Sequence, residues 1–589
     1  MSVDVTHLSP ENLAAAQRSL VCKAIAEFSH ERLLVPVPRG TGFELVSPDG
    51  SVRYAFAARR HALEHWSLDR DSLVRTIDER EQPLDVQRFL VEFAPLLGIP
   101  DSLLPTYLEE LASTLASAAW KLAHSTATVE DLVDADYQAV EAAMTEGHPA
   151  FVANNGRIGF GGDDFAAYAP ETGSPVRLVW VAVRRSLAAL SLSAGISEDD
   201  LYGGELGDET VRRFTERLAD LGLDAADYLW LPLHPWQWVN RVTITFAPDV
   251  ARHDIVFLGE GDDDYRAQQS IRTFFNTSAP ERHYVKTALA IQNMGFLRGL
   301  SPNYMSVTPA INDWVHDLVE ADEELVARGF RVLRECAAIG YTGDAFHALG
   351  FASPYQKMLA ALWRESPAPR LAEGERLATM ASLLHRDAKG SSLVAAMIAR
   401  SGLTAAAWLG SYLDAYLRPL VHCLLRYDLA FMPHGENLVM VLRDHTPVAM
   451  FMKDIGEEVA VMGDLPLPAA VERIRAAVPV EEQSLAIHTD VFDGFFRHLA
   501  AVLDDDGVLA EADFWAEVRA CLDRHLADHP ELAEAAARHD LLRPTFRHSC
   551  LNRLQLRNTL QMVDLADQSS SLMFAGELAN PVGAGTVGG

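Results

Sequence analysis

The feature that most constrains the fold is a predicted β-hairpin with polar residues at both ends. Residues 438–442 and 448–452 are two apolar runs joined by a short polar segment. Asn437 precedes the first run and Asp454 follows the second, so a hairpin would bring their side chains together. Their oxygens suit a hard cation such as Mg²⁺, and protein kinases hold the metal of a nucleotide in this way. The pattern indicates either a metal–nucleotide site or a hairpin with ordinary polar ends.

Basic and hydroxyl side chains are concentrated in a second segment, between residues 270 and 298. The chain has 82 acidic and 50 basic residues, a formal net charge of −32, so a basic cluster stands out. Guanidinium, ammonium and hydroxyl groups are the usual means of binding phosphate. The segment predicts phosphate-binding strands or, alternatively, a solvated strand edge with surface ion pairs. The side chains concerned are Ser270, Arg272, Thr273, Lys286 and Arg298.

A third motif lies in a stretch rich in glycine and asparagine, at residues 147–170. It begins with Gly-His-Pro, which places His148 at its start, and continues through Asn155 and Arg157 around an Asn-Gly turn signal. The stretch is typical either of a loop that grips a ligand or of a hairpin with a capping histidine. Both interpretations remain open from the residues alone.

Hydrophobic periodicity predicts an α+β fold with lobes around a cleft. A Ser-Pro-Glu helix start at residue 9 and helices at 84–94 and 103–123 make the first 145 or so residues mostly helical. Strands are predicted from alternation at 242–246, 271–275 and 285–291, and long helices from a 3.6-residue period at 317–338, 370–384 and 403–427.

Composition and missing motifs exclude several classes of protein. A chain of this net charge would be repelled by phosphate backbones and anionic lipids, so we expect no nucleic-acid or membrane partner. No apolar run reaches the about 20 residues of a membrane helix, and the first residues lack the basic segment of a signal peptide. The five cysteines include no CxxC pair, which fits a reducing cytoplasm. The P-loop, nucleophile-elbow and zincin patterns are absent from the sequence.

Taken together, the motifs resemble those of the NRPS-independent siderophore synthetases, the IucA/IucC family. The resemblance spans nearly the whole chain. The stretches GHPAFVANNGRIGFG (147–161), FMPHGENL (431–438) and CLNRLQLRN (550–558) are most similar to the desferrioxamine-synthetase branch, which activates a succinyl monoamide rather than citrate. The motifs in chain order are Gly147-His148-Pro149, His234-Pro235-Trp236, Ser270, Arg272-Thr273, Lys286, Arg298, His434-Gly435, Asn437 and Lys453-Asp454.

The resemblance implies an ATP- and Mg²⁺-dependent ligase and assigns roles to these residues. Catalysis would rest on Arg298, His434, His148 and Lys286. The ATP phosphates would be held by Ser270, Arg272, Thr273, Lys286 and Arg298, while His434, Asn437 and Asp454 would line the nucleotide site. Asn437 and Asp454 would also be the metal ligands. His148, Asn155 and Arg157 would approach the acyl group.

The family fold is described as a cupped hand, which implies a thumb at 1–170, fingers at 171–385 and a distantly kinase-like palm at 386–589. A homodimer is expected from the same resemblance. Two positions depart from the family pattern. Met432 replaces a glutamate found in many members, and residues 151–157 replace a second His-Pro and a lysine found in others. The second departure disfavours citrate and favours a succinyl substrate.

The predicted reaction is amide formation through an acyl-adenylate, with AMP and pyrophosphate released. The expected substrate is N-hydroxy-N-succinylcadaverine, which would be oligomerised and macrocyclised to a desferrioxamine-type trihydroxamate. A related synthetase could instead join another carboxylate to an amine or a hydroxylated polyamine. Two rival hypotheses are a kinase-like phosphotransferase, which would release ADP, and a non-catalytic binding module.

Overall fold

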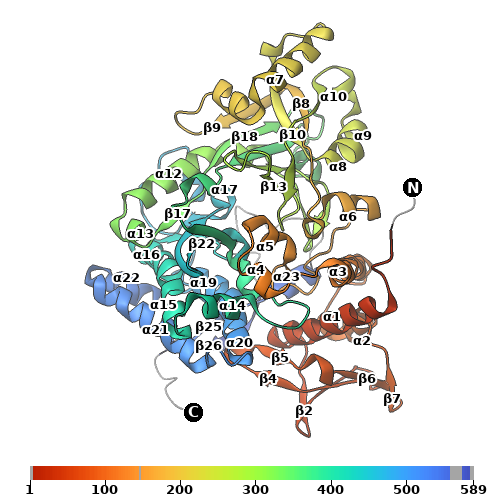
Figure 1. Cartoon of the computed structure of the whole chain (residues 1–589), viewed down its shortest axis with the longest axis vertical. Coiled ribbons are helices and arrows are strands. Elements are labelled where there is room, and N and C mark those ends of the chain that lie inside the picture. The colour runs from red at the N-terminus through yellow and green to blue at the C-terminus, as the bar shows by residue number, and fades with distance from the viewer. Residues whose placement is uncertain (1–3, 145–146, 558–572, 584–589) are drawn as a thin grey trace.

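Three large hydrophobic cores organise the chain, whose computed structural model describes residues 4–144, 147–557 and 573–583. One core is built mainly from residues 16–153, a second from 176–363 and a third mainly from 311–582. In Figure 1 the N-terminal part lies at the lower right, the middle part at the top and the C-terminal helices at the lower left. The α+β class predicted from the sequence is confirmed.

Three helices and a five-stranded antiparallel sheet form the N-terminal core. The Ser9 side chain accepts a hydrogen bond from the backbone of Asn12 and caps the first helix where the sequence predicted its start. All three predicted helices are present, but residues 37–82 also supply a sheet of short strands, so this part of the chain is less helical than predicted. The helices are α1 (Pro10–His30), α2 (Val86–Leu97) and α3 (Leu104–His124); the strands in sheet order are β1 (Val37–Arg39), β2 (Gly42–Val46), β3 (Val52–Phe56), β6 (Val74–Ile77) and β7 (Arg80–Gln82).

Two sheets form the middle of the chain. Predicted strands at 271–275 and 285–291 correspond to shorter neighbours in the larger sheet, where Thr273 pairs with Lys286. The larger sheet has the order β12 (Tyr265–Ala267), β13 (Thr273–Asn276), β14 (Tyr284–Thr287), β19 (Ala360–Arg364), β18 (Glu335–Tyr341) and β9 (Ala188–Leu192). The smaller one has the order β10 (Tyr228–Leu233), β8 (Val179–Arg184) and β11 (Ile255–Glu260).

The predicted hairpin is confirmed as β22 (Leu438–Arg443) and β23 (Thr446–Met452), which pair from Leu438 opposite Met452. Two more strands complete its sheet: β20 (Glu375–Thr379) beside β22 and β17 (Phe330–Val332) parallel to β23. Both come from before residue 386, so the expected boundary between fingers and palm cuts through this sheet. The predicted helix at 403–427 is present as α15 (Ala405–Ala415) and α16 (Leu417–Tyr427).

Three predicted elements are wrong. The expected helix at 317–338 ends early, because Gly329 at φ +67° turns the chain into strands. The second of these, β18, is buried along its whole length and therefore shows no alternation. The helix expected at 370–384 contains β20, and the strand expected at 242–246 is helical. The helices observed in place of these predictions are α12 (Thr308–Ala321), α13 (Glu323–Ala327), a π-helix (Trp238–Val242) and α9 (Thr243–Thr245).

Among the described residues, no single helix has both the length and the apolar character needed to cross a membrane. Helix α14 (Leu393–Ser401) and the helical residues 405–427 reach that length and apolar character when they are taken together. The two parts are bent by 105° relative to each other.

Candidate active site

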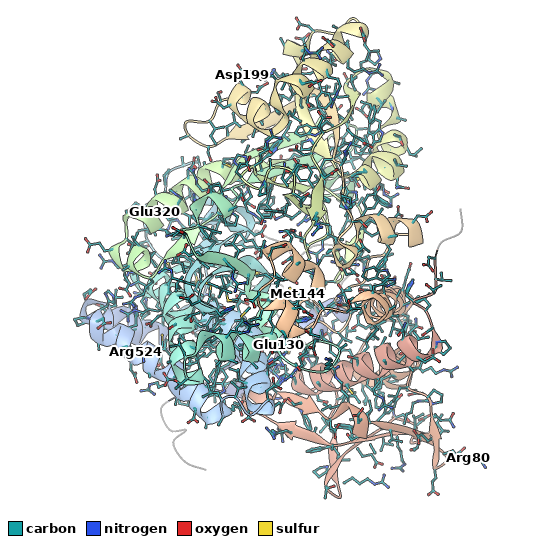
Figure 2. All side chains as sticks on the ribbon, viewed as in Figure 1. Arg80, Glu130, Met144, Asp199, Glu320 and Arg524 are labelled. Carbon is teal, nitrogen blue, oxygen red and sulfur yellow. The ribbon has the colours of Figure 1, made fainter. Side chains whose placement is uncertain are left out.

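One cavity of about 370 Å³ brings the separate sequence motifs together. Met144, one of its lining residues, lies near the centre of the molecule in Figure 2. Nine of the eleven predicted site residues line this cavity: His148, Ser270, Arg272, Thr273, Lys286, Arg298, His434, Asn437 and Asp454. Segments more than 300 residues apart in the sequence therefore share one hollow.

Four of the five predicted phosphate-binding residues lie on β14 or at the start of its partner β13, and Arg298 comes from farther along the chain. Ile271 has φ +61° and is fully buried, an unusual combination for a β-branched residue. Its burial in the core fixes the turn, so that the residues on both sides of it, Ser270 and Arg272, line the cavity. The Ser270 hydroxyl donates to Thr273 Oγ1 at 2.8 Å, and Arg272 Nη1 donates to the Gly299 carbonyl. Two hydroxyls and a guanidinium are thus fixed at one edge of the cavity.

Asp454 is held between two cations. Its Oδ1 accepts from Lys286 Nζ at 2.7 Å and its Oδ2 from Arg364 Nη1 at 3.1 Å. Although burial opposes ionisation, these cations hold the pKa of Asp454 well below its ordinary value. Asp454 also has left-handed backbone dihedrals, φ 61° and ψ 38°, a strained state that clusters at functional sites. The carboxylate is therefore ionised and fixed beside the end of the hairpin.

The loop before the hairpin packs too tightly for any side chain at Gly435. An added Cβ there would lie 2.8 Å from Phe495 and 3.0 Å from the Ala381 Cα. This packing fixes His434, whose Nδ1 accepts from the Glu436 backbone at 3.3 Å. Burial lowers the pKa of His434 to about 4, so its ring is neutral at pH 7. The ring of His148 lies beside it, with centroids 5.6 Å apart.

The Asn437 side chain is oriented through its amide nitrogen. That nitrogen donates to the Met432 carbonyl at 3.0 Å and to the Glu458 carboxylate. Both bonds use the donor end of the amide, which leaves the oxygen as the group that can face a cation. Together with Asp454, which lines the same cavity, it provides the oxygen chemistry that Mg²⁺ requires.

Arg298 is the least satisfied cation of the site. Its Nε and Nη2 are buried and have no hydrogen-bond partner within the described chain. Burial lowers its pKa to about 10, and the nearby charge of Arg272 acts in the same direction. Buried polar groups without a partner are rare in folded proteins and cost stability. The guanidinium is therefore available to bind an anionic ligand.

Asn155 and Arg157 do not line the cavity, in contrast to their predicted role at the acyl group. Arg157 forms a buried ion pair with Glu171 at 2.7 Å, and its other arm donates to the Asn155 side chain at 3.2 Å. The Asn155 amide in turn donates to Asn154 at 3.2 Å. The predicted hairpin is not formed by these residues either, because the loop is buried and pairs through Ile158 instead. These contacts support a structural role.

An acidic wall of the cavity was missed by the sequence analysis. Asp490 and Asp493 reach it from a π-helical segment, His488–Phe496, and such segments are frequent at functional sites. Burial raises the pKa of Asp490 to about 7. Burial also raises the pKa of Glu458 to about 8, and the charge of Asp454 adds to this effect. No sequence motif marks these residues, because burial by distant segments creates their properties.

Comparison with known proteins identifies the family. The model "IucA / IucC family" matches residues 136–385. A putrebactin synthase from Shewanella sp. (strain MR-4) is 47% identical over 585 residues, covering 98% of this chain and 92% of that protein. The chain belongs to the IucA/IucC family. A second model, "Ferric iron reductase FhuF-like transporter", matches residues 406–564.

Solved structures agree with this membership. The aerobactin synthetase IucC from a hypervirulent pathotype of Klebsiella pneumoniae has a TM-score of 0.85 and 27% identity, covering 97% of this chain and 98% of that one. The ATP-bound aerobactin synthetase IucA from the same pathotype has a TM-score of 0.73 at 17% identity, over 97% and 99% of the two chains. The predicted siderophore-synthetase fold is confirmed, while the likeness of its palm to protein kinases stays a prediction.

Proposed function

We propose that this IucA/IucC family member is an ATP-dependent ligase that forms amide bonds between hydroxamate building blocks. The observation that supports this most directly is the convergence of Arg272, Lys286 and Arg298 on one cavity that also holds Asn437 and Asp454. Acidic residues line other parts of the cavity, but two buried nitrogens of Arg298 have no partner among the described residues, which calls for an anionic ligand. The IucA relative described as ATP-bound supports a nucleotide as that ligand.

The cations would act on the first half-reaction. A carboxylate is a poor electrophile, and its attack on the α-phosphate of ATP gives an acyl-adenylate and pyrophosphate. Arg298 and Lys286 stabilise the charge that develops on the phosphates, because fixed donors in a dry site need no reorganisation. Asn437 and Asp454 would hold Mg²⁺, which supplies further neutralisation of phosphate charge.

The second half-reaction needs a base. An alkyl amine with a pKa of about 10.4 arrives protonated and must lose that proton before it attacks the acyl-adenylate. Glu436, Glu457 and His148 line the cavity, and Glu458 adds a carboxyl whose pKa, raised first by burial, is about 8. A carboxylate of this basicity is better matched to neutral pH than His148, whose pKa burial lowers well below its ordinary value.

We propose N-hydroxy-N-succinylcadaverine, or its putrescine homologue, as the substrate. Each monomer carries a carboxylate and an amine, so one site can join monomers and then close the chain into a ring of desferrioxamine type. Ring closure is favoured because a tethered amine has a high effective concentration. The relationship to a putrebactin synthase supports a hydroxamate product. A cytoplasmic location and a homodimer stay predictions.

The test is an assay with ATP, Mg²⁺ and each of the two monomers, read by mass spectrometry and nucleotide analysis. We expect one water lost per amide and one AMP released per amide. Arg298→Met should abolish turnover, whereas Arg212→Met, at an exposed helix position, should not change it. Release of ADP alone would favour a phosphotransferase, and preferential use of citrate would move the enzyme to another branch of the family.

A further inference from the structure

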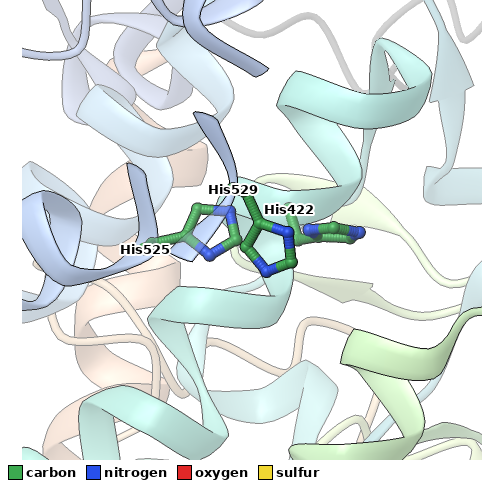
Figure 3. A group of neighbouring side chains, drawn as sticks. All are labelled: His422, His525 and His529. Atoms are coloured by element: carbon green, nitrogen blue, oxygen red, sulfur yellow. The ribbon is translucent and has the colours of Figure 1, made fainter. Parts of the chain in front are cut away.

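Three histidines outside the proposed active site lie together in the C-terminal part of the chain (Figure 3). His422 is on α16, His525 is on α21 (Glu511–Asp528), and His529 caps the end of α21. Their ring centroids are 5.3 Å (His422–His525), 5.0 Å (His422–His529) and 4.8 Å (His525–His529) apart. One ring nitrogen from each lies within 4.8 Å of the other two.

Carboxylates fix the proton positions of two of these rings. His422 Nε2 lies 3.1 Å from Asp322 Oδ2, and His529 Nδ1 lies 3.1 Å from Glu531 Oε1. Since a carboxylate only accepts, His422 Nε2 carries a proton and His422 Nδ1 a lone pair. In His529 the nearer carboxylate places the proton on Nδ1 rather than on Nε2, which lies 3.5 Å from Glu324 Oε2. Those opposite atoms, His422 Nδ1 and His529 Nε2, are buried and have no hydrogen-bond partner in the described chain.

His525 adds a third unsatisfied imidazole. The residue is 0% exposed, and neither of its ring nitrogens has a hydrogen-bond partner among the described residues. Full burial without a partner favours the neutral ring, the form in which histidine binds metals. Two buried rings and one half-buried ring, each with a buried nitrogen that lacks a partner among the described residues, are costly if they serve packing alone.

The charges around the rings favour a cation. Four carboxylates contact the histidines or their neighbours, and Arg328 and Arg418 offset part of this negative charge. Glu324 Oε2 lies 3.5 Å from His529 Nε2, so this carboxylate could supply a fourth ligand. The surrounding charged residues are Asp322, Glu324, Asp528, Glu531, Arg328 and Arg418.

We propose that His422, His525 and His529 form a binding site for a divalent transition-metal ion of the Zn²⁺ class that joins α16 to α21. Metal-ligating histidines characteristically donate their other ring N–H to a carboxylate, as His422 and His529 do here. Three imidazoles with a carboxylate or water in the fourth position match the tetrahedral preference of Zn²⁺. Small ring movements would bring the nitrogens to bonding distance.

The experiment uses the full chain, freed of metal by a chelator and then titrated with Co²⁺ and Zn²⁺. We expect one Co²⁺ per chain, with the visible bands of four-coordinate Co²⁺, and its stoichiometric displacement by Zn²⁺. We expect His529→Gln to weaken Zn²⁺ binding at least about tenfold and His422→Gln combined with it to abolish the bands. Circular dichroism would check that both variants remain folded.

His316→Gln is the matched control. His316 also lies beside a carboxylate, Asp317, and its side chain is 21% exposed against 18% for His529, but it belongs to no cluster among the described residues. This variant should bind Zn²⁺ as the wild type does. The proposal is wrong if the wild type binds no Zn²⁺, or if one Zn²⁺ per chain survives in the double variant. A loss of binding in His316→Gln would equally contradict a specific site.

Discussion

Replacing Arg298 by methionine should strengthen the folded protein while weakening nucleotide binding. Burial, aided by Arg272, lowers the pKa of Arg298 from the ordinary arginine value to about 10, which corresponds to about 3 kcal/mol for burying the charged guanidinium. The folded pKa is the lower one, so this cost is present in full at pH 7 and disappears only as the pH rises from about 10 to the ordinary pKa of arginine. Methionine replaces the aliphatic stem of the side chain and carries no charge, and therefore removes the cost.

Two measurements on Arg298→Met separate the effects. Without nucleotide, we expect a higher thermal unfolding midpoint, by about 2–4 °C for each kcal/mol gained if a lobe of 150–250 residues unfolds as a unit. With ATP, calorimetry should give a dissociation constant about 10- to 100-fold higher, because a hydrogen bond to a charged group contributes about 1.5–3 kcal/mol. Stability and affinity therefore change in opposite directions.

Arg212→Met is the control for these measurements. The Arg212 side chain is 62% exposed on α7 (Glu198–Asp220) and pairs with Glu216 on the same helix, so neither quantity should change by more than a small amount. A lower unfolding midpoint for Arg298→Met would show that the guanidinium is already satisfied in the free protein. Unchanged ATP affinity would refute its role in holding phosphate.

Three further changes test other parts of the cavity. Asp454→Asn should abolish AMP release and lower stability by about 3–5 kcal/mol, measured by urea denaturation, because it leaves Lys286 without its buried partner. Arg157→Met should destabilise the fold similarly, by removing the guanidinium that pairs with the buried Glu171, yet keep the KM values of the folded enzyme; a changed KM would restore its predicted substrate role. The KM for the amine should fall as the pH rises through about 7, where Asp490 ionises, and Asp490→Asn should flatten this profile.

The sequence predicted which residues share the cavity better than it predicted the secondary structure. Asn437 and Asp454 could be located because a hairpin is a local structure, and its register follows from two apolar runs and a short turn. The strand β18 could not, because it is buried on both faces and its apolar residues do not alternate. Sequence patterns therefore identified the elements that are formed by contacts between residues close together in the sequence.

The properties of Arg157 and Asp490 could not be inferred from their residue types. An arginine in a glycine-rich loop has the chemistry of an anion-binding group, but only the fold reveals that Glu171 neutralises it. Conversely, an aspartate within a helix has no distinctive context, and it becomes notable because distant segments bury it and raise its pKa to about 7. Both outcomes depend on long-range contacts, which a single sequence does not specify.

The opposite charges of the cavity follow from the two kinds of ligand that the proposed reaction requires. A site for triphosphate alone would gain from removing every acid, whereas this cavity combines Arg298 with Glu436 and Asp490, whose carboxyl pKa values burial raises. Such groups destabilise the free protein, because each is charged less readily than in water. They become useful together when one substrate brings an anionic phosphate ester and the next an ammonium group. The coexistence of buried acids and an unsatisfied guanidinium in one hollow is therefore better explained by two sequential ligands than by one.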